Sequence, residues 1–195
     1  MDYTYNSIIK PADMITYLKI GDQDIDLVEA LCDRSSQILE TLCNRKFMNC
    51  DSTGEIEITE VHSGNGSQYI FLDMYPIISV TSVKEDADRD FGDDTTADVS
   101  TYFIDSAAGM IVSDSYFGRG NGNIQVKYSG GYTQSTIRKD LVQVTLEIAA
   151  LLYKGKDQIG ISSKSFSDGS AAFFSDKLST WAKAVIAFYS KPVRG

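Results

Sequence analysis

The chain has 195 residues, of which 43% are hydrophobic and 23% charged, the composition of an ordinary globular protein. At this length roughly 70% of the unfolded chain's surface can be buried on folding, so one domain, or one domain with a large insertion, can form a core without disulfides or metals. The three prolines exclude a proline-rich linker, and the net charge of −9 argues against tight nucleic-acid binding because an acidic surface repels phosphate.

The N-terminal part predicts two helices. Pro11 suits the first position of a short helix that carries an apolar stripe and stops at Gly21. A longer helix follows, with Asp24 as its cap and an end near Asn44. Its core-facing side chains recur every three or four residues: Leu27, Val28, Leu31, Cys32, Ser35, Ile38, Leu39 and Leu42.

After the second helix the apolar period changes from 3.6 to 2, which indicates β-strands. Residues 55–61 alternate, with Ile56 and Ile58 on one face and Glu55 and Glu57 on the other. The glycine-rich segment 63–67 has the composition of a hairpin turn, and residues 106–109, flanked by two predicted strands, are expected to form a second hairpin. Residues 118–122 are predicted to be a loop before the last strand. The strands are expected at residues 55–61, 69–72, 77–83, 102–104, 110–112 and 124–128, in one small antiparallel sheet.

Two more helices are predicted near the C-terminus. The third begins at a cap near Ser135 or Thr136 and ends at Gly155. Its buried face is formed by Leu141, Val144, Ile148, Leu151 and Leu152. The fourth runs from about Ser175 to Ser190, and Pro192 closes it. One side of this helix carries the residues expected to face the core: Leu178, Trp181, Val185, Phe188 and Tyr189.

The expected fold class is therefore α+β. It has a four-helix, mainly α body (residues 1–50 and 132–195), and an antiparallel β-sheet (residues 51–131) inserted between helices two and three. Two polar segments, 85–98 and 157–172, are expected to be mobile because they contain too few apolar residues to fold by themselves.

The charge is divided by segment. Residues 1–50 carry a net charge of −3, residues 51–135 carry −10 and residues 136–195 carry +4. Acidic loops keep a protein soluble, and an acidic wall also suits a channel through which DNA slides without sticking.

The three cysteines, Cys32, Cys43 and Cys50, do not form a disulfide pattern. Cys32 and Cys43 lie eleven residues apart on the second predicted helix, and eleven steps of about 100° return to nearly the same face. Both thiols are therefore expected in the core, which fits a reducing compartment. Residues 1–11 lack the features of a signal peptide, and no apolar cluster is long enough to cross a bilayer, so no membrane is expected as a partner.

Candidates for chemistry are few. His62 is the only histidine, so a transition-metal site or a histidine-dependent hydrolytic triad is not expected. The acidic run that begins at Asp86 resembles the first half of a calcium loop, but that loop requires Gly at position 6 and Glu at position 12, where this chain has Phe91 and Ala97. Residues 118–123 lack the Gly-Lys-Ser/Thr ending of a phosphate loop. No catalytic residue, metal or cofactor is predicted, and a hydrolase that binds a divalent metal at the acidic run is the enzyme alternative.

The order of the motifs resembles the head–tail connector (adaptor) family of tailed bacteriophages and gene transfer agents. The resemblance covers about residues 11–192. It rests on the N-terminal helices, the strand MYPIISVTSV at 74–83, the strand IQVKYSGGY at 124–132 directly before an apolar helix, and the closing Trp/Tyr helix. The acidic segment 85–98 is longer than this family leads us to expect.

The resemblance implies a structural, non-enzymatic protein of the virion neck, made in the host bacterial cytoplasm. Such proteins form a ring, usually a dodecamer, beneath the portal protein. They extend the channel for double-stranded DNA without sequence-specific binding, and they offer a platform for the next neck or tail protein. Another neck component, a stopper or a tail terminator, is the alternative, although those proteins are usually mostly β.

Two groups of residues are candidates for contacts in such a ring. A C-terminal segment that orders on docking can wrap a partner, and the portal-contact candidates there are Phe173, Phe174, Lys191, Pro192, Val193 and Arg194. Carboxylates that line a channel repel DNA, and the channel-facing candidates are Asp86, Asp88, Asp90, Asp93 and Asp94.

Overall fold

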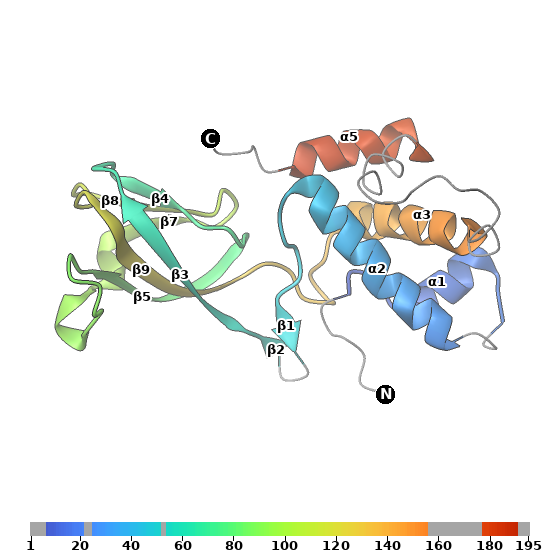
Figure 1. Cartoon of the computed structure of the whole chain (residues 1–195), viewed down its shortest axis with the longest axis horizontal. Coiled ribbons are helices and arrows are strands. Elements are labelled where there is room, and N and C mark those ends of the chain that lie inside the picture. The colour runs from blue at the N-terminus through green and yellow to red at the C-terminus, as the bar shows by residue number, and fades with distance from the viewer. Residues whose placement is uncertain (1–6, 22–24, 52–53, 156–176, 191–195) are drawn as a thin grey trace. The chain divides into compact units, whose positions relative to one another are not determined.

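The computed structural model of the chain describes residues 7–21, 25–51, 54–155 and 177–190. The chain divides into two compact units (Figure 1). A helical unit comprises Met1–Met48 and Gln134–Gly195, and a β unit comprises Asn49–Thr133.

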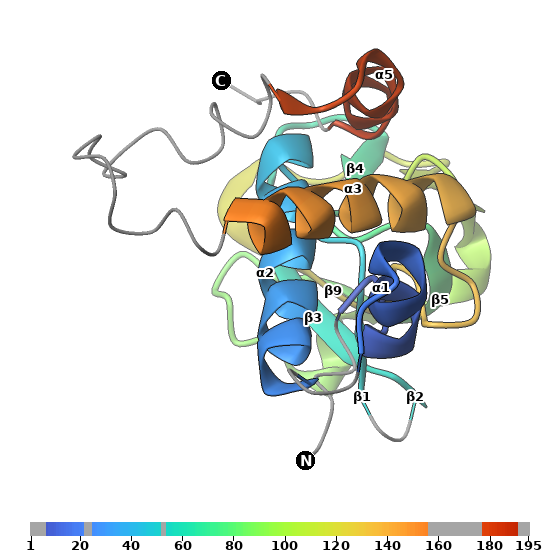
Figure 2. The same cartoon turned by 90° about the vertical axis from the view of Figure 1, so that its right-hand side faces the viewer.

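The helical unit packs its helices around one core. Its helices are α1 (Pro11–Leu18), α2 (Ile25–Cys43), α3 (Lys139–Gly155) and α5 (Thr180–Tyr189). Helices α1, α2 and α3 all contact one another, and Figure 2 shows them gathered into one bundle. Helix α5 contacts both α2 and α3.

Local signals explain where two of these helices begin and end. Pro11 occupies the first turn of α1, as predicted, and the Asp13 carboxylate accepts a hydrogen bond from the Lys10 N–H at 3.1 Å. Lys19 ends this helix in the left-handed conformation, with φ of 54°. Ser179 caps α5, because its hydroxyl accepts a hydrogen bond from the Ala182 N–H at 3.1 Å.

The core of the helical unit confirms the prediction for two of the cysteines. Cys32 and Cys43 are free and buried, and the Cys32 sulfur lies 3.9 Å from the sulfur of Met14. Burial is the main cause that raises the pKa of each thiol to about 12. The other large buried side chains of this core include Ile8, Ile9, Val28, Leu39, Phe47, Leu141 and Ile148.

The fourth helix differs from the prediction. Helix α5 starts at Thr180, the expected start at Ser175 lies outside the described residues, and Trp181 and Phe188 do not face the core. Trp181 is 46% exposed and Phe188 is 80% exposed, whereas Ala182 and Tyr189 are buried. Each successive residue is turned by about 100° around a helix, so contact with α2 and α3 buries only one part of an apolar stripe this wide.

The β unit contains two larger sheets and a short two-stranded ribbon. The four-stranded sheet has the order β3-β9-β5-β6 and the three-stranded sheet the order β4-β8-β7, and all neighbouring strands are antiparallel. The strands are β1 (Cys50–Asp51), β2 (Gly54–Glu55), β3 (Glu57–Gly64), β4 (Tyr69–Phe71), β5 (Ile77–Glu85), β6 (Thr96–Ala97), β7 (Tyr102–Asp105), β8 (Met110–Ser113) and β9 (Gly120–Gly130).

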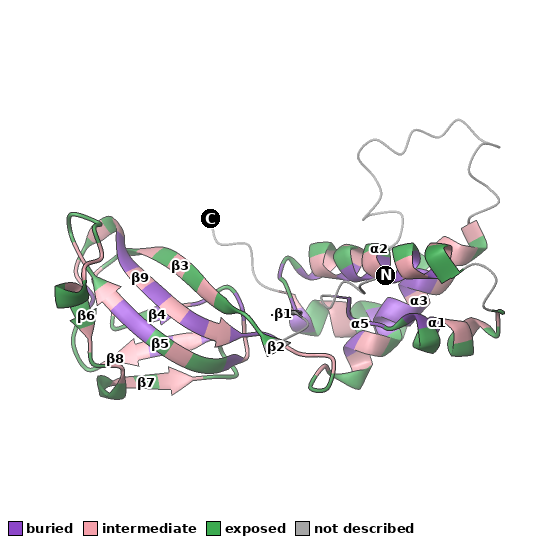
Figure 3. Cartoon of the chain, turned by 90° about the horizontal axis from the view of Figure 1, so that it is seen from below, coloured by how far each residue is buried: buried purple, intermediate pink, exposed green. Residues whose placement is uncertain are grey.

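The two larger sheets share one hydrophobic core. The four-stranded sheet contributes side chains of β5 and β9, the strands with long buried stretches in Figure 3, and the three-stranded sheet contributes Ile70 and Ile111. The buried members of this core are Ile70, Leu72, Met74, Ile77, Val83, Ile111, Phe117, Ile124, Val126 and Tyr128. The strands were predicted as one sheet, and the structure instead packs two sheets face to face.

The two predicted hairpins have different outcomes. The turn at 106–109 joins β7 to β8 as predicted, and Gly109 takes a φ of +67° there. The turn at 63–67 does not form a hairpin, because β3 pairs with β9 while β4 pairs with β8. At this point the chain leaves one sheet and enters the other.

The predicted loop at 118–122 is partly strand, since β9 already begins at Gly120, which pairs with Gly64. The Asn123 side chain joins this end of the sheet by accepting a hydrogen bond from the Gly64 N–H at 2.8 Å and donating to the Gly118 carbonyl at 3.0 Å. A Cβ atom at Gly64 would lie 1.8 Å from the Gly118 carbonyl oxygen. The glycines therefore serve close backbone approach.

The alternation expected along 77–83 is also interrupted. The pairing of β5 with β9 shifts register between Ile77 and Ser79 and again between Val80 and Ser82. Each bulge exchanges the two faces of the strand, which is why Ile77, Val80 and Val83, spaced by three residues, all lie toward the core opposite Gly130, Tyr128 and Val126.

The chain is thus α+β with antiparallel sheets, as expected, but it is not mainly α, because strands are as prominent as helices among the described residues.

The third helix starts at Lys139, after a turn at 134–136, and not at the predicted cap. None of the described helices is long and apolar enough to cross a bilayer.

Candidate functional site

The acidic segment 85–98 is ordered, contrary to the prediction that it is mobile. The Asp86 carboxylate accepts hydrogen bonds from the N–H groups of Asp88 at 2.9 Å and Phe91 at 2.8 Å. These backbone hydrogen bonds hold the pKa of Asp86 below its usual value. Side chain–backbone hydrogen bonds of this kind stabilise a turn without a hydrophobic core.

Further contacts attach the acidic segment to its sheet. The Lys84 ammonium group donates to the Phe91 carbonyl at 2.9 Å and forms an ion pair with Asp93 at 3.2 Å. Strand β6 then pairs with the end of β5. After it, Asp98 accepts hydrogen bonds from the Ser100 backbone N–H at 2.9 Å and the Ser100 hydroxyl at 2.8 Å. These two bonds lower the pKa of Asp98.

The five channel-facing candidates therefore share one ordered loop but have different roles in it. Asp88, Asp90, Asp93 and Asp94 are exposed, whereas Asp86 is half-buried and organises the loop. No group of three His, Cys, Asp or Glu side chains suited to hold a metal ion occurs in the part of the chain that the structure describes.

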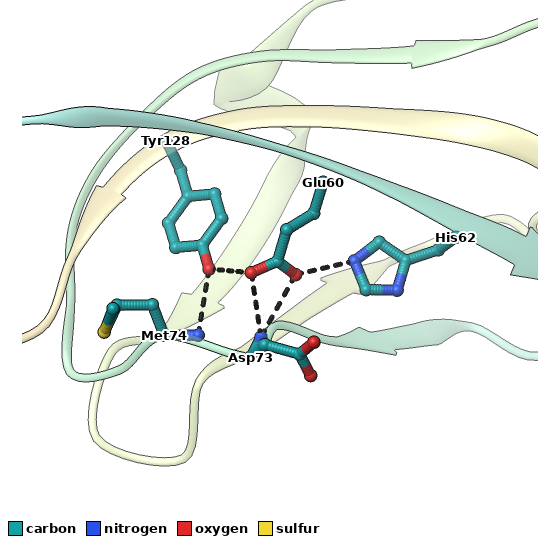
Figure 4. Close-up of polar contacts among 5 residues, drawn as sticks. All are labelled: Glu60, His62, Asp73, Met74 and Tyr128. Carbon is teal, nitrogen blue, oxygen red and sulfur yellow. Dashed lines mark hydrogen bonds and ion pairs between the residues drawn. The ribbon is translucent and has the colours of Figure 1, made fainter. Parts of the chain in front are cut away.

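A second polar cluster, in the core of the β unit, was not predicted (Figure 4). The Tyr128 phenol donates a hydrogen bond to Glu60 Oε1 and accepts one from the Met74 N–H at 3.0 Å. Both Glu60 carboxylate oxygens also accept from the Asp73 N–H at 3.1 Å, and Glu60 Oε2 lies 2.9 Å from His62 Nε2. We call Glu60, His62 and Tyr128 the Glu60 cluster.

The Glu60 cluster joins parts of the chain that are far apart in sequence. Glu60 and His62 lie on β3, Tyr128 on β9, and the Asp73 and Met74 amides lie in the connection from β4 to β5. Tyr128 is fully buried, and burial, followed by its hydrogen bond to Glu60, raises the pKa of the phenol far above its usual value. The phenol is thus kept protonated as a hydrogen-bond donor, and its bonds stabilise the fold of the β unit.

One signal in the sequence could have revealed this cluster. Along β3 the exposed positions alternate with less exposed ones, so Glu60 and His62 share the inward face with Ile58. An acid on the inward face of an amphipathic strand needs a partner. The partner itself, Tyr128, is 68 residues away, and only the pairing of β3 with β9 brings it near.

The C-terminal candidates lie outside the described residues. This applies to Phe173, Phe174, Lys191, Pro192, Val193 and Arg194. Trp181, which was expected in the core, is instead exposed on α5 beside that segment of the sequence.

Comparison with known proteins identifies the family. Residues 7–191 match the family of head completion proteins. None of the curated proteins matches the chain. The fold is similar to that of a chain from the neck of an empty gene transfer agent particle computed with C6 symmetry, with a TM-score of 0.61 and 16% identity over 100% of this chain and 96% of that chain.

Two further solved structures are similar. A chain of the virion of a native gene transfer agent particle has a TM-score of 0.61 and 16% identity, covering 96% of this chain and 91% of that chain. A chain of the neck of a native particle computed with C12 symmetry has a TM-score of 0.55 and 15% identity, covering 97% and 96%. The match to the family spans nearly the whole sequence, so the chain belongs to the head completion protein family. The resemblance to head–tail connectors is thereby confirmed.

Proposed function

We propose that this chain is a head–tail adaptor: a non-catalytic protein that forms a ring, expected to be a dodecamer, beneath the portal of a phage-like capsid. In this role it extends the channel for double-stranded DNA and joins the capsid to the next neck or tail protein. The carrying observation is the match to head completion proteins over residues 7–191. The similarity to chains in gene transfer agent necks, over nearly the full length of both chains, supports it.

Within this role, residues 1–50 and 132–195 form the body of the adaptor and residues 51–131 form an inserted subdomain between its second and third helices. The order of elements supports this division, since all the described strands lie between α2 and α3 in the sequence. The protein is made in the bacterial host and functions in the neck of the virion.

A mass measurement tests the proposal. Light scattering of the purified chain, alone and mixed with the portal protein from the same genome, should show a ring alone or a monomer that joins the portal ring. A monomer that does not bind the portal would reject the adaptor role. The stopper is the second candidate, because the chain has more β structure than the prediction allowed. A stopper would bind only after another neck protein covers the portal.

The acidic loop is proposed to face the DNA path, where its carboxylates repel the phosphates. Asp86 and Asp93 form hydrogen bonds or ion pairs within the loop, so the sharpest test replaces only Asp88, Asp90 and Asp94 by Asn. Particles with this variant should release DNA more slowly. The matched control neutralises three exposed acids elsewhere, with Asp26→Asn, Glu55→Gln and Asp114→Asn, and should have no effect. Equal release rates for the loop variant and the wild type would reject the channel position.

The C-terminal segment is proposed to contact the portal through Phe173, Phe174 and residues 191–194. Its aromatic and basic side chains support this, because the segment 136–195 carries a net charge of +4. Deletion of residues 191–195, or replacement of both phenylalanines by Ala, should weaken portal binding. Binding as tight as that of the wild type in both variants would reject the contact.

A further inference from the structure

The strands of the three-stranded sheet are apolar on both faces. Strands β4 and β8 read Tyr-Ile-Phe and Met-Ile-Val, and each turns its central isoleucine, Ile70 or Ile111, into the core. The side chains before and after these isoleucines point to the opposite face. Antiparallel sheets with one face in water normally carry polar residues on that face, whereas continuous apolar runs are typical of strands covered on both faces.

The outward side chains form two rows across the three strands. Val112 on β8 pairs with Tyr69 on β4 and with Phe103 on β7. Met110 pairs with Phe71 and with Asp105 in the same way. The Tyr69 and Phe71 rings meet edge to face, with centroids 5.4 Å apart. We call this face, formed by Tyr69, Phe71, Phe103, Met110, Val112 and Asp105, the outer sheet face.

The outer sheet face has the composition of an interface. Phe103 is 68% exposed and Tyr69 is 50% exposed. Exposed aromatic and methionine side chains in one contiguous patch mark sites of protein–protein contact.

Helix α5 carries a second uncovered apolar surface. Only Thr180 and Lys183 among its ten residues are neither apolar nor aromatic, and a helix that is apolar around most of its circumference is normally buried. Trp181, Ala184 and Phe188 are exposed at the spacing of one helical face. We call these three residues the α5 surface.

The α5 surface is held in place by two polar contacts with α3. The Ser179 hydroxyl, just before α5, donates to Glu147 at 2.9 Å, and the Tyr189 hydroxyl at its end donates to Asp140 at 2.9 Å. The exposed aromatics are therefore presented on an anchored helix. Rigid aromatic side chains of this kind are the usual centres of binding energy in interfaces.

We propose that the α5 surface of one copy packs on the outer sheet face of the next copy in the ring. This proposal rests on the ring assembly proposed above. A cyclic ring needs two different surfaces on each subunit, one for each neighbour, and these two apolar surfaces belong to different units of the chain.

Charge favours this pairing over contacts between identical surfaces. The β unit, residues 49–133, has a net charge of −10, whereas the helical unit that contains α5 has +1, from −3 over residues 1–48 and +4 over residues 134–195. Two outer sheet faces in contact would bring acidic units together, including both copies of Asp105 within the contact. The pairing of α5 with the sheet places the acidic β unit against a unit that is nearly neutral, so it avoids this repulsion.

Crosslinking between copies tests the contact. Cysteines are introduced by Phe103→Cys and Trp181→Cys in a background with Cys50→Ser. The remaining cysteines, Cys32 and Cys43, are buried. The full-length chain is assembled on the portal, treated with a short bis-maleimide and run on a denaturing gel. The double variant should give a ladder that rises by one subunit per step to the full ring. Each single variant should stay monomeric, because its cysteine faces no second cysteine.

Other results separate the possible failures. Dimers from Phe103→Cys alone, or from Trp181→Cys alone, would show contact between identical surfaces and overturn the pairing. The pairing would also be overturned if the double variant joins the portal ring but gives no ladder, or gives a crosslink within one chain only. Either result would leave the adaptor role intact. A wild-type chain that forms no ring would overturn both.

A substitution gives an independent readout. Phe103→Ser should lower the fraction of chain in rings at least tenfold at a concentration where the wild type is half assembled. Tyr17→Ser, at an exposed aromatic in α1, is the control and should assemble normally. Circular dichroism must show that both variants are folded. Normal assembly of a folded Phe103→Ser variant would overturn the proposal.

Discussion

Replacing Tyr128 by Phe removes the buried hydroxyl at the centre of the Glu60 cluster. The hydroxyl donates to Glu60 and accepts from the Met74 N–H at 3.0 Å. Its loss leaves a buried N–H without this acceptor, at a cost of about 1–3 kcal/mol, and removes a hydrogen bond to a carboxylate, which contributes about 1.5–3 kcal/mol. Because the two contributions share one hydroxyl and are not additive, we expect the free energy of unfolding of the β unit to fall by about 2–4 kcal/mol.

The assay is urea denaturation followed by far-UV circular dichroism, with hydrogen exchange of β3 and β9 peptides to assign the transition to the β unit. That assignment is needed because the two units of the chain can unfold separately. Tyr116→Phe removes a hydroxyl from a tyrosine that is 73% exposed and serves as the control. A loss in Tyr128→Phe no larger than that of the control would refute the reasoning.

The same substitution changes the response to base. The pKa of Tyr128 is raised in the folded state by burial and by Glu60, while in the unfolded chain it is about 10. The unfolded state therefore loses this proton first, and the stabilisation that Tyr128 provides is complete below about pH 10 and falls as the pH rises above that value. Stability measured from pH 9 to 11 should decline less steeply in Tyr128→Phe than in the wild type.

Three further predictions concern other parts of the chain. Gly109→Ala should lower the free energy of unfolding of the β unit, measured in urea, by at least about 1–2 kcal/mol. The φ of Gly109 is +67°, and the new Cβ would lie 2.8 Å from a tyrosine side chain. Gly21→Ala is the control and should be neutral, because its Cβ would meet no atom within 4 Å. Cys32 and Cys43, whose burial raises each pKa to about 12, should resist alkylation at pH 8 in the folded protein and react only after unfolding, as residue-resolved mass spectrometry would show. Glu147→Ala removes the acceptor for Ser179 and should speed amide exchange in α5 relative to α2; unchanged exchange would contradict the anchoring.

Local patterns in the sequence predicted the helices well. Pro11 at the start of α1, the spacing of apolar residues along α2 and the burial of both of its cysteines all follow from the 3.6-residue period. Capping and periodicity depend on neighbouring residues, so a sequence displays them directly.

Strand pairing could not be read in this way. Strand β9 lies between β3 and β5 and pairs with both, at sequence separations of about 40 to 70 residues. The two bulges in β5 exchange its faces and leave no period-2 signature. The Glu60 cluster depends on this same long-range pairing, so the sequence does not indicate which residue is the partner of Glu60.

The acidic segment shows a different reason for failure. Its composition predicted mobility because it contains few apolar residues, yet Asp86, Lys84 and Asp98 order it through hydrogen bonds to nearby backbone groups and side chains. The number of apolar residues indicates the hydrophobic contribution to folding, but it does not indicate the contribution of side chain–backbone hydrogen bonds.

The sequence by itself thus determined which segments are helical or extended, where the charge lies and which family the motif order resembles. Only the tertiary structure decided which strands are neighbours and which side of an apolar helix is covered. The apolar stripe of α5 is wider than the contact that α2 and α3 offer, so Tyr189 is buried while Phe188, the next residue, is exposed. A period shows that a face is apolar, but what covers that face depends on residues distant in the sequence or, in the contact proposed for Trp181 and Phe188, on another copy of the chain.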